Sequence, residues 1–182
     1  MRQSIAYKMK RIFLTGYMGA GKTTLGKDLA TLMGLSFIDL DCYIEERYCR
    51  TVSRIFAEKG EDGFRDIERR MLHEVAMFED VLISTGGGTP CFFDNMSFMN
   101  GVGTTVYLKA SVKELAARLN ISRTTRPVLK NRSGDELLAF VAESLKKREP
   151  YYMQASVVFD AEVMDTKEDV RSLSQALMGM IG

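Results

Sequence analysis

The chain has no tryptophan, a single histidine, and only three cysteines and three prolines. The cysteines, Cys42, Cys49 and Cys91, are odd in number and contain no C-x-x-C pair, so they give no sign of a disulfide framework. His73 has no second histidine with which to form a zinc site, and we expect it to be structural or solvent-facing. This pattern suits a reducing compartment, and we expect a cytoplasmic protein.

Long apolar runs and an excess of charge of one sign are also missing. No stretch approaches the ~20 apolar residues that a membrane span requires, and the opening MRQSIAYKMKR lacks the apolar core of a signal peptide. Lys and Arg total 25 against 24 Asp and Glu, which gives a net charge of +1. This balance gives no reason to expect nucleic acid or an anionic membrane as partner.

The remaining composition is that of an ordinary globular protein. Hydrophobic residues make up 46% of the 182 positions and charged residues 27%, which is enough apolar material for one core. No internal repeat, low-complexity tract or linker splits the sequence. We predict a single domain over residues 10–182, preceded by an N-terminal extension, residues 1–9, that has no pattern of its own.

Hydrophobic periodicity alternates between strand and helix along the chain. Short apolar runs predict five strands, at residues 12–14, 36–38, 81–84, 104–108 and 157–159. Longer periodic segments predict helices at residues 22–33, 41–79 with a break at 59–63, 112–119, 135–148 ending near Pro150, and at the C-terminus. This alternation implies an α/β fold of three layers, with a five-stranded parallel sheet flanked by helices.

Residues 120–134 interrupt this alternation. The segment NISRTTRPVLKNRSG is polar and basic and follows neither period. Long irregular segments inside compact domains are uncommon and are often lids or binding loops. We expect a lid here, with a disordered connection as the alternative.

The segment GYMGAGKT, from Gly16 to Thr23, fits the phosphate-binding pattern G-x-x-x-x-G-K-[ST]. It follows a predicted strand and opens a predicted helix, so backbone N–H groups and the helix dipole can surround phosphates. In such a loop Lys22 reaches the β- and γ-phosphates and the Thr23 hydroxyl can bind Mg²⁺. We predict a P-loop NTPase-type fold that binds a nucleoside triphosphate, with a glycine turn between strand and helix as the alternative.

Other motifs narrow the class of P-loop protein. The guanine-reading string N-K-x-D is absent from the sequence, which argues against a GTPase switch. Residues 157–160, VVFD, imitate a Walker B strand but lie late in the chain, and we expect only a core strand there. The nearer acids are Asp39 and Asp41, at the end of the second predicted strand.

Asp39 and Asp41 lie where ligands collect in open α/β sheets, at the carboxyl end of a strand. One carboxylate can hold water on Mg²⁺, and the other can accept a hydrogen bond from an attacking hydroxyl. A turn followed by a helix N-cap is the alternative for Asp41, and the two roles are compatible. We predict a catalytic role for Asp41.

Arg65 and Arg148 are candidates for binding an anion, because arginine presents a planar fork that holds a carboxylate through two hydrogen bonds. Surface ion pairs are a common alternative for any single arginine on a helix. The residues alone do not decide between these two roles.

Together these motifs resemble those of the shikimate kinase family. The matching segments are Gly16 to Thr23, Asp39-x-Asp41, FRDIE at 64–68, GGG at 86–88, Arg126-Pro127 and Arg148-x-Pro150-x-Tyr152. They occur in the family's order over nearly the whole chain from about Lys10. The resemblance implies a sheet like that of nucleoside monophosphate kinases. It also implies transfer of the ATP γ-phosphoryl group to the 3-hydroxyl of shikimate, which gives shikimate 3-phosphate and ADP on the route to chorismate.

The resemblance also implies roles for individual residues. Those implied to be catalytic are Asp41, Lys22 and Arg126, the last from the lid. Those implied to bind shikimate are Asp41, Arg65, Gly86, Gly87, Gly88 and Arg148, and the helical region 41–79 would carry part of this site. Those implied to bind ATP are Gly16, Gly19, Ala20, Gly21, Lys22, Thr23, Thr24, Arg118 and Arg126. Thr23 and, through water, Asp39 would serve Mg²⁺, and the protein would be a monomer.

Two other functions are weighed against this one. The first is a gluconate or nucleotide kinase of the same architecture, against which the pair Arg65 and Arg148 argues together with Gly86 to Gly88. The second is a catalytically silent ATP-binding module, which would have no need of an intact Lys22 and Asp41.

Overall fold

The computed structural model describes residues 10–121 and 134–182. Five parallel strands form one sheet in the order β2-β3-β1-β4-β5. They are β1 (Arg11–Thr15), β2 (Ser36–Asp39), β3 (Val81–Ser84), β4 (Thr104–Lys109) and β5 (Val157–Asp160). The strand order reverses direction at β1, and in such sheets ligands bind beyond the carboxyl ends of the strands at that point. The predicted α/β fold with a five-stranded parallel sheet is confirmed.

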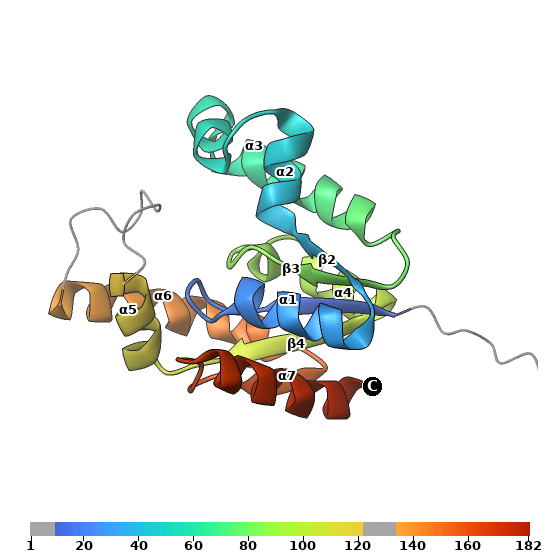
Figure 1. The fold of residues 1–182 in the computed structure, drawn as a ribbon. Coiled ribbons are helices and arrows are strands. Elements are labelled where there is room, and N and C mark those ends of the chain that lie inside the picture. Colours follow the sequence, from blue (N-terminus) through green and yellow to red (C-terminus); the bar gives the residue numbers. More distant parts are fainter. Residues whose placement is uncertain (1–9, 122–133) are drawn as a thin grey trace, which may run out of the picture.

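Helices cover both faces of the sheet (Figure 1). They are α1 (Lys22–Met33), α2 (Leu40–Tyr48), α3 (Val52–Val75), α4 (Asn95–Val102), α5 (Val112–Ile121), α6 (Asp135–Tyr152) and α7 (Lys167–Ile181), with a 3-10 turn η1 (Thr89–Cys91). Helix α1 packs on α7 and α5 packs on α6, whereas α2 and α3 pack on each other at the top of the view. In the described part of the chain, every helix is too short or too polar to cross a bilayer.

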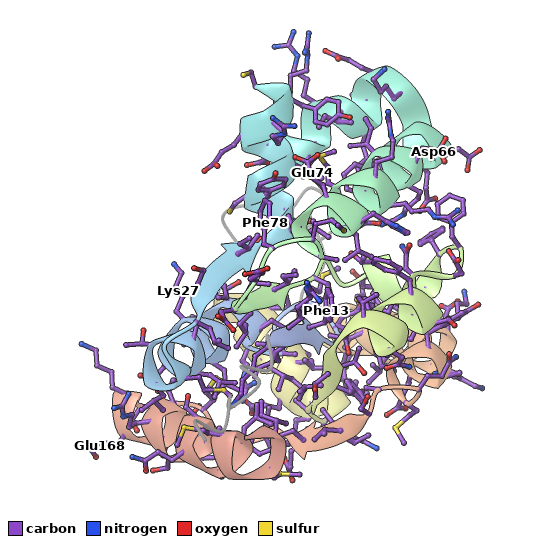
Figure 2. The ribbon with its side chains drawn as sticks, turned by 90° about the vertical axis from the view of Figure 1, so that its right-hand side faces the viewer. Phe13, Lys27, Asp66, Glu74, Phe78 and Glu168 are labelled. Atoms are coloured by element: carbon purple, nitrogen blue, oxygen red, sulfur yellow. The ribbon has the colours of Figure 1, made fainter. Side chains whose placement is uncertain are left out.

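The alternation of side chains along β1 divides the core in two. Ile12 and Leu14 pack in a cluster with residues of α1, α5, α6 and α7, and Phe13 packs in the other with residues of α2, α3 and α4. Phe13 is fully buried, whereas Asp66 and Glu168 project outward (Figure 2). Burial on both faces explains why this strand is a continuous apolar run in the sequence.

The predicted helical segment 41–79 forms two helices. Cys49 ends α2 in the left-handed conformation, with φ 48°, and the Thr51 side chain caps α3 by accepting a hydrogen bond from the Arg54 N–H. Inside α3, Gly60 is non-helical and kinks the helix, which confirms the predicted break at 59–63. The break after α2 was missed because neither glycine nor proline marks it.

Three elements differ from the prediction. Helix α6 continues through Pro150 to Tyr152 rather than ending near the proline; one missing N–H in the last turn does not stop it, and the buried Tyr152 anchors its end. Helix α4 was not predicted, since its short sequence NMSFMNGV gives little helical signal. Strand β5 lies at the sheet edge with Val158 40% exposed, so it is not the core strand we expected.

The predicted lid, residues 120–134, is described only at its ends. Asn120 and Ile121 finish α5, and Gly134 precedes α6. The rest of it, Arg126 included, lies outside the described residues.

The packing of α1 on the sheet can be tested at Gly26, where a Cβ would lie 2.7 Å from Phe37 Cε2 and 3.0 Å from Leu14 Cδ1. We expect Gly26→Val to lower the free energy of unfolding by about 1–3 kcal/mol, because it overpacks this contact. At Gly179 in α7 a Cβ would meet nothing within 4 Å, so we expect Gly179→Val to change it by less than about 0.5 kcal/mol. Urea denaturation measures both, and equal losses would contradict the packing account.

Candidate active site

The loop between β1 and α1 contains the predicted phosphate-binding residues. Gly21 is the N-cap of α1 with φ 88°, a left-handed conformation that favours glycine, and a Cβ there would lie 2.6 Å from Met164 Cε. Within this loop, Gly16 and Ala20 are buried. The first residues of α1 line a cavity, and the N–H groups and dipole of a helix N-terminus favour an anion there.

Lys22 lies at the start of α1, beneath this loop. Its Nζ donates hydrogen bonds to the carbonyl oxygens of Gly16, at 2.8 Å, and Tyr17, at 3.0 Å. The ammonium group is therefore held beside the same backbone that would surround a phosphate, within reach of its oxygens.

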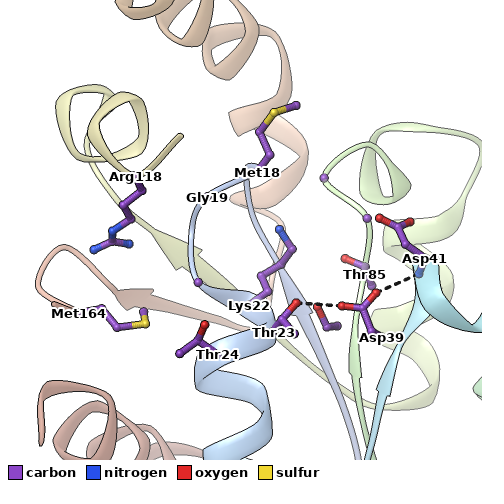
Figure 3. Close-up of a pocket in the computed structure, with 14 residues that line it drawn as sticks. Met18, Gly19, Lys22, Thr23, Thr24, Asp39, Asp41, Thr85, Arg118 and Met164 are labelled. Carbon is purple, nitrogen blue, oxygen red and sulfur yellow. Dashed lines mark hydrogen bonds between the residues drawn. The ribbon is translucent and has the colours of Figure 1, made fainter. Parts of the chain in front are cut away.

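Thr23 and Asp39 place two kinds of oxygen next to Lys22. Thr23 Oγ1 donates to Asp39 Oδ2 at 2.8 Å, and Asp39 Oδ1 accepts from the Asp41 N–H at 3.1 Å (Figure 3). Asp39, not Asp41, is thus the N-cap of α2. Hydroxyl and carboxylate oxygens suit Mg²⁺. Within residues 10–121 and 134–182 no group of three or more His, Cys, Asp or Glu side chains could hold a metal alone, which fits an ion that keeps waters and phosphate oxygens as ligands.

A cavity of about 370 Å³ extends across the carboxyl ends of the strands. Arg118 and Met164 lie on one side of it and Asp39 and Asp41 on the other, with Lys22 between them (Figure 3). The phosphate loop therefore separates two halves of one cavity, each with its own polar groups.

The three glycines at 86–88, which follow β3, lie against predicted site residues. A Cβ on the first, second and third glycine would lie 3.1 Å from Asp41 Oδ1, 3.7 Å from Arg148 Nη1 and 2.7 Å from both Nη atoms of Arg65. A side chain at the first or third position would displace the charged group that it meets. The glycine segment thus leaves room for the Asp41 carboxylate and the Arg65 guanidinium, with Arg148 at ordinary contact distance from the second glycine.

Arg65 is buried on α3, with 8% of its surface exposed. Its Nη1 donates to Glu68 Oε2 at 2.9 Å and its Nη2 to Glu61 Oε1 at 3.3 Å. Glu68 is 1% exposed and also accepts from Thr89 Oγ1 at 2.6 Å. Among the described residues, Arg65 Nε has no hydrogen-bond partner. Both Nη atoms are therefore anchored by glutamates, and each keeps a second N–H that can bind an anion.

Arg148 approaches the glycine segment from α6. Its Cζ lies 5.6 Å from the centre of the Tyr17 ring, and Tyr152 donates its hydroxyl proton to Gly87 O. Burial raises the pKa of Tyr152, so this phenol stays a neutral donor. Burial also raises the pKa of Cys91 to about 11, although Arg148 and Arg65 oppose the shift, so the thiol adds no negative charge here at neutral pH.

Arg118 is fixed on the opposite side of the cavity. Its Nε donates to Glu114 Oε1 at 2.6 Å, and its Nη2 donates to the carbonyl oxygens of Ala161, at 3.0 Å, and Glu162, at 2.7 Å. These bonds tie α5 to the segment after β5 that carries Met164. A planar guanidinium and a thioether at one end of a cavity suit a flat aromatic group.

The structure brings most of the predicted site residues together. Those that line the cavity are Gly19, Gly21, Lys22, Thr23, Thr24, Asp39, Asp41, Gly86, Gly87 and Arg118. The lining does not include Arg65, Gly88 or Arg148. These residues adjoin it, because Gly88 continues the glycine segment and the two arginines lie against that segment. Arg126 falls outside the described residues, so its role stays a prediction.

Several residues of the site were missed from the sequence. Met18, Ser84, Thr85 and Met164 also line the cavity. Ser84 and Thr85 directly precede the glycines, which was a usable signal, whereas Met164 belongs to no motif. Glu68 lies in the matched FRDIE segment but received no role, and its burial beside Arg65 shows that it anchors that side chain.

Sequence comparison places this site in a known family. The model of the shikimate kinase family matches residues 18–178. A shikimate kinase of Parabacteroides distasonis is 70% identical over 173 residues, which cover 95% of this chain and 100% of that protein.

Solved structures agree with the sequence match. The shikimate kinase of Bacteroides thetaiotaomicron has a TM-score of 0.92 at 53% identity, covering 95% of this chain and 98% of that one. The shikimate kinase of Acinetobacter baumannii, solved in complex with shikimate, has a TM-score of 0.82 at 32% identity, covering 96% of this chain and 93% of that one. The chain therefore belongs to the shikimate kinase family.

Proposed function

We propose that this protein transfers the γ-phosphoryl group of ATP to the 3-hydroxyl of shikimate, giving shikimate 3-phosphate and ADP. The observation that carries the proposal is the convergence of Asp41, Arg65 and Arg148 on the glycines at 86–88, next to the phosphate loop. Shikimate presents hydroxyl groups and a carboxylate. The Asp41 carboxylate can accept a hydrogen bond from a hydroxyl, and the guanidinium groups of Arg65 and Arg148 can bind the carboxylate. Membership of the family supports the same reaction.

The nucleotide would occupy the half of the cavity beside α1 and α5. The backbone of the phosphate loop and Lys22 would hold the β- and γ-phosphates, and Lys22 would exchange its bonds to Gly16 and Tyr17 for phosphate oxygens. Arg118 would lie against the adenine. Arg126, from the lid at 120–134, would add positive charge at the transferred group.

Thr23 and Asp39 are the residues that would hold Mg²⁺, the hydroxyl directly and the carboxylate through water, since their oxygens already lie 2.8 Å apart beside the phosphate loop. Bound there, the ion would neutralise charge on the β- and γ-phosphates.

Arg65 and Arg148 would bind the shikimate carboxylate and so fix the ring in one orientation. Asp41 would then accept a hydrogen bond from the 3-hydroxyl and take its proton as the oxygen attacks the γ-phosphorus. Most of the catalysis in such a transfer comes from positioning and charge neutralisation, and the paired arginines and Lys22 supply both.

The wider setting belongs to the same proposal. We infer a cytoplasmic monomer built as one domain over residues 10–182, in which the region 41–79 carries part of the shikimate site. Free thiols at Cys42, Cys49 and Cys91 suit a reducing compartment.

The reaction is tested by ADP release with Mg·ATP, comparing shikimate, gluconate, a nucleoside monophosphate and no acceptor. We expect turnover with shikimate alone, because the carboxylate site selects an acid of this shape. We also expect EDTA to abolish turnover, because it removes the Mg²⁺ that neutralises the phosphate charge. Turnover with another acceptor in place of shikimate would favour a related kinase. ATP binding without turnover on any acceptor would favour the silent module.

The role of Asp41 predicts a loss of turnover that leaves ATP binding nearly intact. We expect Asp41→Asn to lower kcat by about 10²–10⁴-fold, because the amide cannot take the proton of the attacking hydroxyl. The dissociation constant for ATP, measured by calorimetry, should stay close to that of the wild type. A comparable loss of ATP affinity would rule out this division of labour.

The role of Arg65 predicts a loss confined to shikimate binding. Arg65→Lys keeps a positive charge beside Glu68 but removes the planar fork, so we expect KM for shikimate to rise by about 10- to 100-fold with KM for ATP unchanged. The control is Arg69→Lys, four residues along α3, where the 39% exposed side chain pairs with Asp94 at 2.7 Å. Equal effects in the two variants would argue against carboxylate binding by Arg65.

A further inference from the structure

The guanidinium of Arg65 lies over the ring of Phe92, which follows η1. Arg65 Cζ lies 4.0 Å from the centre of the Phe92 ring, compared with 5.3 Å for Phe64 and 5.7 Å for Phe56. A cation this close to a ring is attracted by its electron-rich face, most strongly where water is excluded. The Arg65 side chain is only 10% exposed, so the contact with Phe92 is of the strong kind.

The backbone around Phe92 belongs to the glycine segment. The N–H of Cys91 donates to Gly88 O at 2.8 Å, and the N–H of Asn95 donates to Phe92 O at 3.3 Å. Asn95 also donates its side-chain amide to Thr89 O at 2.9 Å. The turn that brings Gly88 against Arg65 therefore also fixes where the Phe92 ring lies.

Packing of the core does not account for this ring. Phe92 is half-buried, and among the described residues it belongs to neither of the two hydrophobic core clusters. Its neighbour Cys91, by contrast, packs against the first cluster. The contact with Arg65 is thus the principal one that the structure gives the Phe92 ring.

We propose that Phe92 is a positioning residue for the acceptor, which holds the plane of the Arg65 guanidinium so that its remaining donors meet the carboxylate of shikimate. Glu68 holds the guanidinium at Nη1, Glu61 holds it at Nη2, and the Phe92 ring lies against Cζ, so three contacts restrict its rotation. The Arg65 side chain is only 10% exposed beside this ring, and lower local polarity strengthens a charge-assisted hydrogen bond. This proposal rests on the proposed function.

The test is Phe92→Leu, which keeps apolar bulk but removes the aromatic face. We expect KM for shikimate to rise about tenfold, with kcat and KM for ATP nearly unchanged, and Phe92→Tyr to retain tight binding because its ring is kept. The matched control is Phe93→Leu, since the 54% exposed Phe93 lies 5.1 Å from Arg69 rather than over Arg65. An unchanged KM in Phe92→Leu, or an equal rise in Phe93→Leu, would overturn the proposal.

A second measurement separates positioning of charge from a general loss of structure. Calorimetry compares the binding of shikimate with that of its uncharged carboxamide to the wild type and to Phe92→Leu. We expect the wild type to bind shikimate more tightly than the carboxamide, and Phe92→Leu to lose most of this preference. Equal weakening of both ligands would show a purely structural role and overturn the proposal.

Failure of the proposed function gives a different result. A wild-type protein that neither binds nor phosphorylates shikimate would overturn both proposals together. Normal turnover by the wild type with no effect of Phe92→Leu would overturn only the assignment of Phe92.

Discussion

The pairing of β1 with β3 sets the geometry on which the rest of the site depends. The two strands run in register from Arg11 and Val81 to Leu14 and Ser84, and Thr85 then donates both its N–H and its hydroxyl to Leu14 O, at 3.1 and 3.0 Å. Both glycine-rich loops therefore leave the sheet side by side. A Cβ on the second glycine of 86–88 would lie 3.4 Å from the N atom of Met18 in the phosphate loop. The sites for the phosphoryl donor and for the acceptor are thus neighbours because β1 and β3 are paired and Thr85 joins their ends.

On the acceptor side of the cavity, a buried carboxylate balances a buried guanidinium. Arg65 is buried with Glu68, and Thr89 satisfies a further oxygen of that carboxylate. Removing one member of such a pair leaves an unpaired charge, which typically costs about 3–5 kcal/mol. The substrate carboxylate can therefore use Arg65 without the protein carrying an isolated cation when the site is empty. The neutral thiol of Cys91 leaves this balance undisturbed.

Local patterns allowed much of this structure to be predicted. The phosphate loop, the pair Asp39 and Asp41, and the five strands could be predicted because each depends on neighbours in the sequence. Met164 could not, because it reaches Gly21 only when the segment after β5 folds across from the far end of the chain. The contact of Phe92 with Arg65 joins residues 27 positions apart, and no pattern in the sequence pairs the two. Non-local contacts of this kind are decided by tertiary packing.

The close approach of Gly88 to Arg65 also has an evolutionary consequence. A Cβ at position 88 would lie 2.7 Å from both Nη atoms of Arg65, so the guanidinium would have to move away from the place where Glu68 holds it. A displaced guanidinium would present its donors elsewhere, so a change at position 88 would act through Arg65. Substitutions at such neighbouring sites are not additive. The two residues should therefore be inherited as a unit, and a lineage that abandoned one would be expected to have abandoned the acid substrate as well.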